Sequence, residues 1–148
     1  MFKERKKYMG KCIVSAVVLM VLLFGSQCFA SFRPAVIGGI RDGAALGLML
    51  ESGTTNNATL RLGVEANTGS TPGIIFVGGK WLLSSIYSRY PMFISGGLVG
   101  YLGNTNSDAG PYISLIVERL FDVSPLFLEV GIDVVRSGRL QFQVGYYL

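Results

Sequence analysis

The last eleven residues, 138–148, alternate between apolar and polar side chains, and they constrain the fold more than any other stretch. Side chains of an extended strand point alternately to its two faces. One face carries Leu140, Phe142, Val144, Tyr146 and Leu148, and the other carries Gln141, Gln143, Gly145 and Tyr147. Because the chain ends here, we expect this strand to lie at a sheet edge or to close against an earlier strand. A closed barrel removes the exposed edge.

Residues 1–30 have the features of a secretory signal peptide. Five basic side chains among the first 11 residues outnumber one acid, Glu4, and the apolar run 13–24 follows them. Small residues up to Ala30 then precede the expected cleavage point, an order typical of a cleaved leader. An uncleaved anchor helix would need about 20 apolar residues. Because Gln27 follows an apolar run that is already too short, the cleaved interpretation is favoured.

Removal of this leader leaves a neutral chain. Residues 31–148 contain eight basic and eight acidic side chains, so the formal net charge of +4 belongs to the leader. A nucleic-acid partner, which a basic surface would favour, is therefore not expected. Both cysteines, Cys12 and Cys28, also lie in the leader, so no disulfide can stabilise the mature chain.

Eight short runs separated by turn residues follow from residue 31 onward, and none shows a helical period. The predicted strands are 33–41, 44–51, 58–67, 73–83, 91–102, 111–121, 126–135 and 138–148. Residues 84–90 are the longest predicted connection, and 103–110 has the composition of a loop. The run 91–102 is apolar or small on both faces, so its orientation stays open.

A tilted membrane strand needs about 9–11 residues, and bacterial outer-membrane barrels have even strand numbers from about eight upward. The chain meets both requirements, and its last strand resembles that of the small outer-membrane β-barrels of the OmpA and OmpX kind. In those proteins the last strand alternates apolar residues up to an aromatic or apolar end and directs barrel assembly. Leu148 stands where phenylalanine is usual.

This resemblance implies an all-β protein, an antiparallel up-and-down eight-stranded transmembrane β-barrel over 31–148 preceded by a cleavable helical signal peptide over 1–30. It also implies a bacterial outer-membrane location, reached by export. The expected partners are membrane lipids and, through the C-terminal strand, the outer-membrane barrel-assembly machinery.

Polar side chains occupy the faces opposite the leucine and valine rows. Arg61 and Glu65 are four residues apart, as are Glu129 and Asp133, so each pair shares a face at a separation of about 13 Å. The residues predicted to line the lumen are Arg61, Glu65, Lys80, Glu118, Glu129, Asp133, Gln141 and Gln143. Since buried charges need partners, we expect Arg61 and Lys80 to neutralise some of these acids in a polar plug. Solvated charges on a soluble sheet and a selectivity ring in a narrow pore remain alternatives.

Aromatic residues help to decide which face points outward. If the first strand rises from the periplasm, most aromatics fall near the periplasmic ends of the runs, as an interfacial aromatic girdle requires. The predicted girdle contains Trp81, Tyr87, Tyr90, Phe121, Phe127 and Tyr146. The alternative is a soluble periplasmic lipocalin-like barrel with a polar outside and an apolar, ligand-binding inside.

The chain contains no histidine, so a Ser-His-acid triad and imidazole-ligated metals are excluded. Outer-membrane lipid A deacylases and palmitoyl transferases are similar in size and architecture, but the histidine that they use has no counterpart here. No phosphate-binding loop, dinucleotide fingerprint or EF-hand spacing is present. We therefore predict a non-enzymatic protein without catalytic residues, cofactor or metal. Its short loops favour a structural, envelope-integrity or interaction role, with a small pore for ions or solutes as an alternative.

Overall fold

A computed structural model describes residues 32–53, 58–86, 89–103, 106–136 and 138–148, with the side chains of 84–86 left out. The predicted signal peptide over 1–30 lies outside these residues. Among the described residues, no helix is long and apolar enough to cross a membrane.

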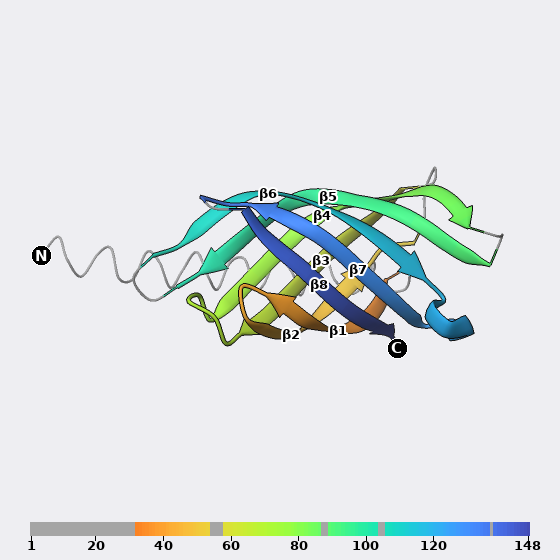
Figure 1. Cartoon of the computed structure of the whole chain (residues 1–148), viewed down its shortest axis with the longest axis horizontal. Coiled ribbons are helices and arrows are strands. Elements are labelled where there is room, and N and C mark those ends of the chain that lie inside the picture. The colour runs from red at the N-terminus through yellow and green to blue at the C-terminus, as the bar shows by residue number, and fades with distance from the viewer. Residues whose placement is uncertain (1–31, 54–57, 87–88, 104–105, 137) are drawn as a thin grey trace, which may run out of the picture. The chain divides into compact units, whose positions relative to one another are not determined.

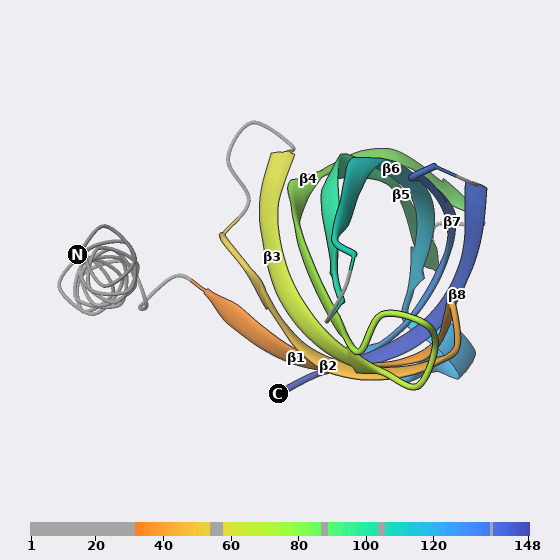
Figure 2. The same cartoon turned by 90° about the vertical axis from the view of Figure 1, so that its left-hand side faces the viewer.

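Eight antiparallel strands form a closed barrel in chain order, in which each strand pairs with the next and the first pairs with the last (Figures 1 and 2). The strands are β1 (Arg33–Arg41), β2 (Ala44–Glu51), β3 (Ala58–Asn67), β4 (Gly73–Ile86), β5 (Tyr90–Leu102), β6 (Asp108–Glu118), β7 (Leu126–Val134) and β8 (Gly138–Tyr147). The predicted all-β, up-and-down, eight-stranded barrel is confirmed. The first three strands have the predicted bounds.

The hairpin of β4 and β5 is longer than predicted. Residues 84–86 continue β4 instead of forming a connection, and β5 begins at Tyr90. The register shifts between Leu82 and Ser84. A bulge of this kind interrupts the alternation of side chains, and Leu82 and Leu83 are both exposed. The alternation of apolar and polar residues therefore stops in the sequence at the bulge, although the strand itself continues to Ile86.

Strand β6 is displaced toward the N-terminus relative to its prediction. Residues 108–110 pair with β5, with Asp108 opposite Tyr101, although their composition suggested a loop. The strand ends at Glu118, and Leu120–Asp122 form the short 3-10 helix η2. Arg119, Phe121 and Asp122 all have positive φ. Phe121, predicted at the end of a strand, therefore lies in a turn.

The last strand closes the barrel with its apolar face outward. Its pairs with β1 run from Ala35 opposite Tyr147 to Arg41 opposite Gln141. Gln141 and Gln143 are buried inside, whereas Leu140 and Phe142 are exposed. The alternation read from residues 138–148 thus corresponds to a lumen face and an outer face.

The other strands of the barrel also direct their apolar side chains outward. Exposed apolar side chains on the outer face include Leu46, Leu48, Leu60, Leu62, Val64, Ile75, Val77, Leu98, Ile113, Val130 and Ile132. The orientation of β5, which the sequence left open, places Leu98 outside and Ser95 and Val99 inside. A lipocalin-like barrel would have a polar outside and an apolar inside, so the structure shows the reverse of that alternative.

Close approach of the strands at the barrel closure requires glycine at position 39. A Cβ at Gly39 would overlap the Phe142 carbonyl and the Gln143 Cα, which are backbone atoms of β8. We expect Gly39→Ala to lower the free energy of unfolding by about 1–3 kcal/mol, the usual cost of overpacking. Urea denaturation of the barrel refolded into lipid vesicles measures this change in the free energy of unfolding. Gly138→Ala is the control, because nothing lies within 4 Å of a Cβ there; equal losses in both variants would contradict the prediction.

Candidate functional site: the polar interior of the barrel

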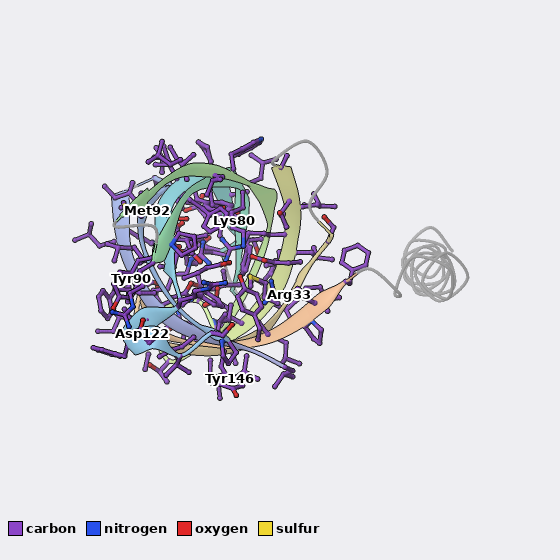
Figure 3. The ribbon with its side chains drawn as sticks, turned by 90° about the vertical axis from the view of Figure 1, so that its right-hand side faces the viewer. Arg33, Lys80, Tyr90, Met92, Asp122 and Tyr146 are labelled. Atoms are coloured by element: carbon purple, nitrogen blue, oxygen red, sulfur yellow. The ribbon has the colours of Figure 1, made fainter. Side chains whose placement is uncertain are left out.

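Charged side chains gather inside the barrel, and Lys80 is seen within the ring of strands from the end at which the C-terminus lies (Figure 3). The interior cations of the described chain are Arg41, Arg61 and Lys80, and the interior carboxylates are Glu51, Glu65, Glu118, Glu129 and Asp133. They form three groups, described below as the Arg41, Arg61 and Lys80 clusters.

The Arg41 cluster connects five strands. Arg41 donates from Nε and Nη2 to the two oxygens of Asp133 at 2.7 and 2.9 Å, and from Nη1 to Glu65 Oε1 at 2.7 Å. The Tyr101 hydroxyl donates to Asp133, and Gln143 Nε2 donates to Glu65 Oε2 at 2.6 Å. A forked guanidinium on a carboxylate is one of the strongest hydrogen-bonded pairs in proteins. The cluster therefore fixes β1, β3, β5, β7 and β8 relative to one another.

The Arg61 cluster contains a second ion pair in which a guanidinium donates hydrogen bonds to both oxygens of one carboxylate. Arg61 donates from Nη1 and Nη2 to the two oxygens of Glu129 at 3.1 and 2.7 Å, and Nη1 also donates to Ser95 Oγ. Ser114 Oγ donates to Glu129 Oε1 at 2.6 Å, and Gln141 Nε2 does so at 3.1 Å. Ser95 and Ser114 are thus hydrogen-bonding partners of this ion pair.

The Lys80 cluster lies nearer the C-terminus and includes Tyr147. Lys80 Nζ donates to Glu51 Oε2 at 2.7 Å and to Glu118 Oε1 at 2.8 Å. The Tyr147 hydroxyl lies 2.9 Å from Glu51 Oε2 and 3.0 Å from Glu118 Oε1. Arg61 Nε is 3.1 Å from Glu51 Oε1, and this contact joins the Lys80 and Arg61 clusters.

Carboxylates outnumber cations in these clusters, five to three. A buried carboxylate without partners is costly, and neutral donors meet part of this need. The hydroxyls of Tyr101, Ser114 and Tyr147 and the amides of Gln141 and Gln143 hydrogen bond to the carboxylates. The interior thus holds two polar networks of charged and neutral donors: the Arg41 cluster, and the Arg61 and Lys80 clusters, which the contact between Arg61 and Glu51 joins.

All eight lumen residues predicted from the sequence point into the barrel. Seven are buried, and Glu118 is partly buried. The sequence prediction missed Arg41, Glu51, Tyr101 and Tyr147 as network members. Arg41 and Glu51 lie at the ends of their strands but keep the period-two phase of their buried neighbours, such as Met49. This alternation could have identified Arg41 and Glu51 as residues that face the lumen.

The predicted aromatic girdle is only partly visible in the structure. Trp81, Phe121 and Tyr146 are exposed, Tyr90 is partly buried, and Tyr87 lies outside the described residues. Phe127 is wrong as a girdle residue, because its side chain is 0% exposed and its ring packs inside against Tyr147 at a centroid distance of 4.8 Å. Position 127 shares a strand face with Glu129, so the alternation of β7 directs it inward.

In the part of the chain that the structure describes, no group of three or more histidine, cysteine, aspartate and glutamate side chains is placed to hold a metal ion. Besides hydrogen bonds and ion pairs, the interior contains a packed apolar cluster that includes Ile37, Ile74 and Ile116.

The molecule is thus a closed, eight-stranded antiparallel barrel with an apolar exterior and a salt-bridged polar interior. The N-terminal β-barrel domain of Pseudomonas aeruginosa OprF has a similar structure, with a TM-score of 0.57 at 12% sequence identity over 80% of this chain and 97% of that domain. The resemblance to OmpA-like outer-membrane barrels is therefore confirmed in the fold. No family model and no curated protein sequence matches the chain.

Proposed function

We propose that this chain is an outer-membrane β-barrel protein with a structural or envelope-integrity role. The exposed leucine, isoleucine and valine side chains that surround the barrel support this proposal. Soluble proteins rarely expose continuous apolar surfaces of this extent, whereas an outward apolar band is required of a barrel in a bilayer. Burial of that band in lipid also leaves the polar interior away from the hydrocarbon.

Export to that location is part of the proposal. The basic, apolar and small segments of residues 1–30 are those of a signal peptide, and residues 31–148 form the mature domain. The outward apolar face of β8 is the feature that the assembly machinery would bind. Exposed Trp81 and Tyr146 are suited to the headgroup region, where aromatic side chains with a polar atom are favoured.

A structural role agrees with the filled interior and the short turns. The three clusters connect strands across the lumen, and the connections at the end away from the C-terminus are short, with two residues between β1 and β2. Long external loops of the kind that adhesion or receptor barrels carry are not found among the described connections. The networks therefore serve mainly to hold the barrel closed.

A small pore for ions or solutes is the second candidate, and the cavities at the two mouths favour it. One, of about 100 Å³, is lined by residues that include Glu51, Lys80 and Glu118, and the other, of about 390 Å³, by residues that include Asp108 and Arg139. The polar clusters separate them. Single-channel recording in planar bilayers distinguishes the candidates: we expect no stable conductance steps for a closed structural barrel, and regular steps would favour the pore.

The membrane location has a direct test. We expect the mature chain, residues 31–148, to fractionate with outer membranes, to refold only in detergent or lipid, and to migrate differently on a mild detergent gel before and after heating. Folded barrels held by a closed sheet resist the detergent until heated. A chain that is soluble, monomeric and rich in β-structure in plain buffer would show that the proposed location is wrong.

A further inference from the structure

The β4–β5 hairpin extends beyond β3 at the end of the barrel where the C-terminus lies (Figure 1). Pairing between β3 and β4 ends with Ala58 opposite Trp81, whereas β4 remains paired with β5 as far as Ile86 opposite Tyr90. Among the described residues, the backbone of 82–86 therefore has no strand partner on the side that faces away from β5. We call this unpaired side the β4 edge.

The backbone groups of Ser85 point toward the β4 edge. Ser85 lies opposite Pro91 of β5, and proline has no N–H to donate. The two residues therefore form a non-hydrogen-bonded pair, in which the N–H and C=O of each residue point away from the partner strand. The second proline agrees with this alternation. Leu98 lies opposite Pro111 of β6, so the even-numbered residues of β5 direct their backbone groups toward β4, and Pro91 directs its own away.

The opposite side of the hairpin, along β5, is protected against pairing. Strand β5 extends past its pairing with β6 by Tyr90 and Pro91 only, and Pro91 offers no donor there. An ion pair at 2.7 Å between Arg89 Nε and Asp122 Oδ1 also joins this side of the hairpin to η2. Proline and charged side chains are means by which proteins prevent pairing at a sheet edge. The β4 edge has neither, because residues 81–88 contain no proline and no charged residue.

The surroundings of the β4 edge are aqueous. Open sheet edges do not occur in contact with the hydrocarbon of a bilayer, because their backbone groups would lack partners. In the proposed membrane orientation this edge therefore lies on the periplasmic side, beyond the headgroup region that suits Trp81. Leu82 and Leu83 are nevertheless 48% and 57% exposed beside it. An unpaired backbone edge with apolar, uncharged flanks matches one class of partner, an extended and uncharged peptide segment that adds a strand to the sheet.

A second copy of this chain in the same membrane does not fit the β4 edge. Two identical edges pair as antiparallel strands only when a two-fold axis perpendicular to the sheet relates them. The wall of a barrel stands across the bilayer, so this axis would lie in the membrane plane and would invert the second barrel. Chains inserted in one orientation cannot form such a pair, and the occupant must be a segment of another polypeptide.

We propose that the β4 edge binds an extended, uncharged segment of a periplasmic polypeptide as an added strand, through the backbone N–H and C=O of Ser85 and its neighbours. The compartment of the partner and the exclusion of a second copy rest on the proposed outer-membrane location. The pairing itself requires only the folded hairpin, so it can be measured in detergent whatever the location of the chain.

The test uses the mature chain, residues 31–148, refolded in detergent, and a short, capped peptide of alternating valine and threonine as the probe. Trp81 is the only tryptophan of the chain, and it immediately precedes the β4 edge, so its fluorescence reports binding. We expect a Kd of about 1 mM or lower. Ser85→Pro should weaken binding about tenfold or more, because proline removes the N–H that faces the edge and its ring blocks a partner. Ser85→Thr keeps the N–H and is the matched control, with unchanged binding.

Four results would overturn the proposal. A folded barrel, identified by its heat-dependent gel mobility, that does not bind the probe would show that the edge takes no strand. Equal binding by a folded Ser85→Pro barrel would place the peptide elsewhere. Equal binding of the same peptide N-methylated at every residue would exclude backbone pairing. Dimers of the barrel that Ser85→Pro abolishes would identify a second copy as the occupant. A chain that is soluble in plain buffer would instead contradict the membrane location and leave the binding result standing.

Discussion

Replacement of Arg61 with methionine is expected to lower the free energy of unfolding by about 3–5 kcal/mol, the usual cost of removing one partner from a buried ion pair. Arg61 is fully buried and donates through a fork to Glu129, and its Nε also faces Glu51. Methionine has a similar volume and keeps the apolar part of the side chain, so the loss reports on charge more than on packing. Two carboxylates would remain buried with fewer positive charges nearby.

Urea denaturation of the barrel refolded into lipid vesicles measures the loss. The matched control is Arg89→Met, because Arg89 pairs with Asp122 at 2.7 Å while its side chain is 66% exposed. An exposed pair contributes only about 0–1 kcal/mol. The double variant Arg61→Met with Glu129→Gln should recover part of the loss, since a neutral amide replaces one uncompensated carboxylate. Similar small effects for Arg61→Met and Arg89→Met would show that the interior charges do not hold the barrel together.

The strand count, the order of the strands and the orientation of most faces could be predicted, because clean alternation is visible in the sequence. Residues 58–67 and 138–148 each have one apolar and one polar face, and each was oriented correctly. Strand β5 lacks this contrast. Its glycines Gly96 and Gly97 pair with Gly79 and Gly78 of β4, and residues without side chains carry no information about which face is buried.

Part of the composition of the polar interior was predictable, but the pairing of its charges was not. Arg41 and Asp133 are 92 residues apart in the chain and meet only because the sheet closes. Which carboxylate each cation contacts depends on how far neighbouring strands are shifted relative to one another around the barrel. The residue pattern of one strand says nothing about this shift. The period-two rule therefore identifies candidates for the lumen but does not assign partners.

The β6–β7 connection shows another limit. Phe121 was expected to continue a strand, but it adopts φ 54° in the turn and is 80% exposed. A left-handed conformation is rare for a bulky residue, so the residue type gave no signal of the turn. Arg119 and Asp122 in the same turn also have positive φ. The direction of the Phe121 side chain therefore depends on the backbone conformation of the whole turn, which its residue types do not reveal.

Introduction of arginine at Val130 is expected to lower the free energy of unfolding in lipid by about 2–4 kcal/mol, the cost of this charge on the lipid face near the bilayer midplane. Val130 is the central residue of β7, and its side chain is 45% exposed on the outer surface. In water an exposed valine can be replaced by arginine at little cost. The expected loss therefore arises only if hydrocarbon surrounds the middle of the barrel. Leu62, in the middle of β3 and also exposed, should behave in the same way.

Val123 provides the matched control for this experiment. It is also an exposed valine, at 42%, but it follows η2 in the turn between β6 and β7. Arginine near the interface costs about 0–1 kcal/mol, so urea denaturation in vesicles should separate Val130→Arg from Val123→Arg. The two variants introduce the same charge at equally exposed valines and differ in their position along the barrel. Equal effects would mean that the apolar surface does not lie in a bilayer, whereas a clear difference would measure the contribution of the membrane to the stability of this fold.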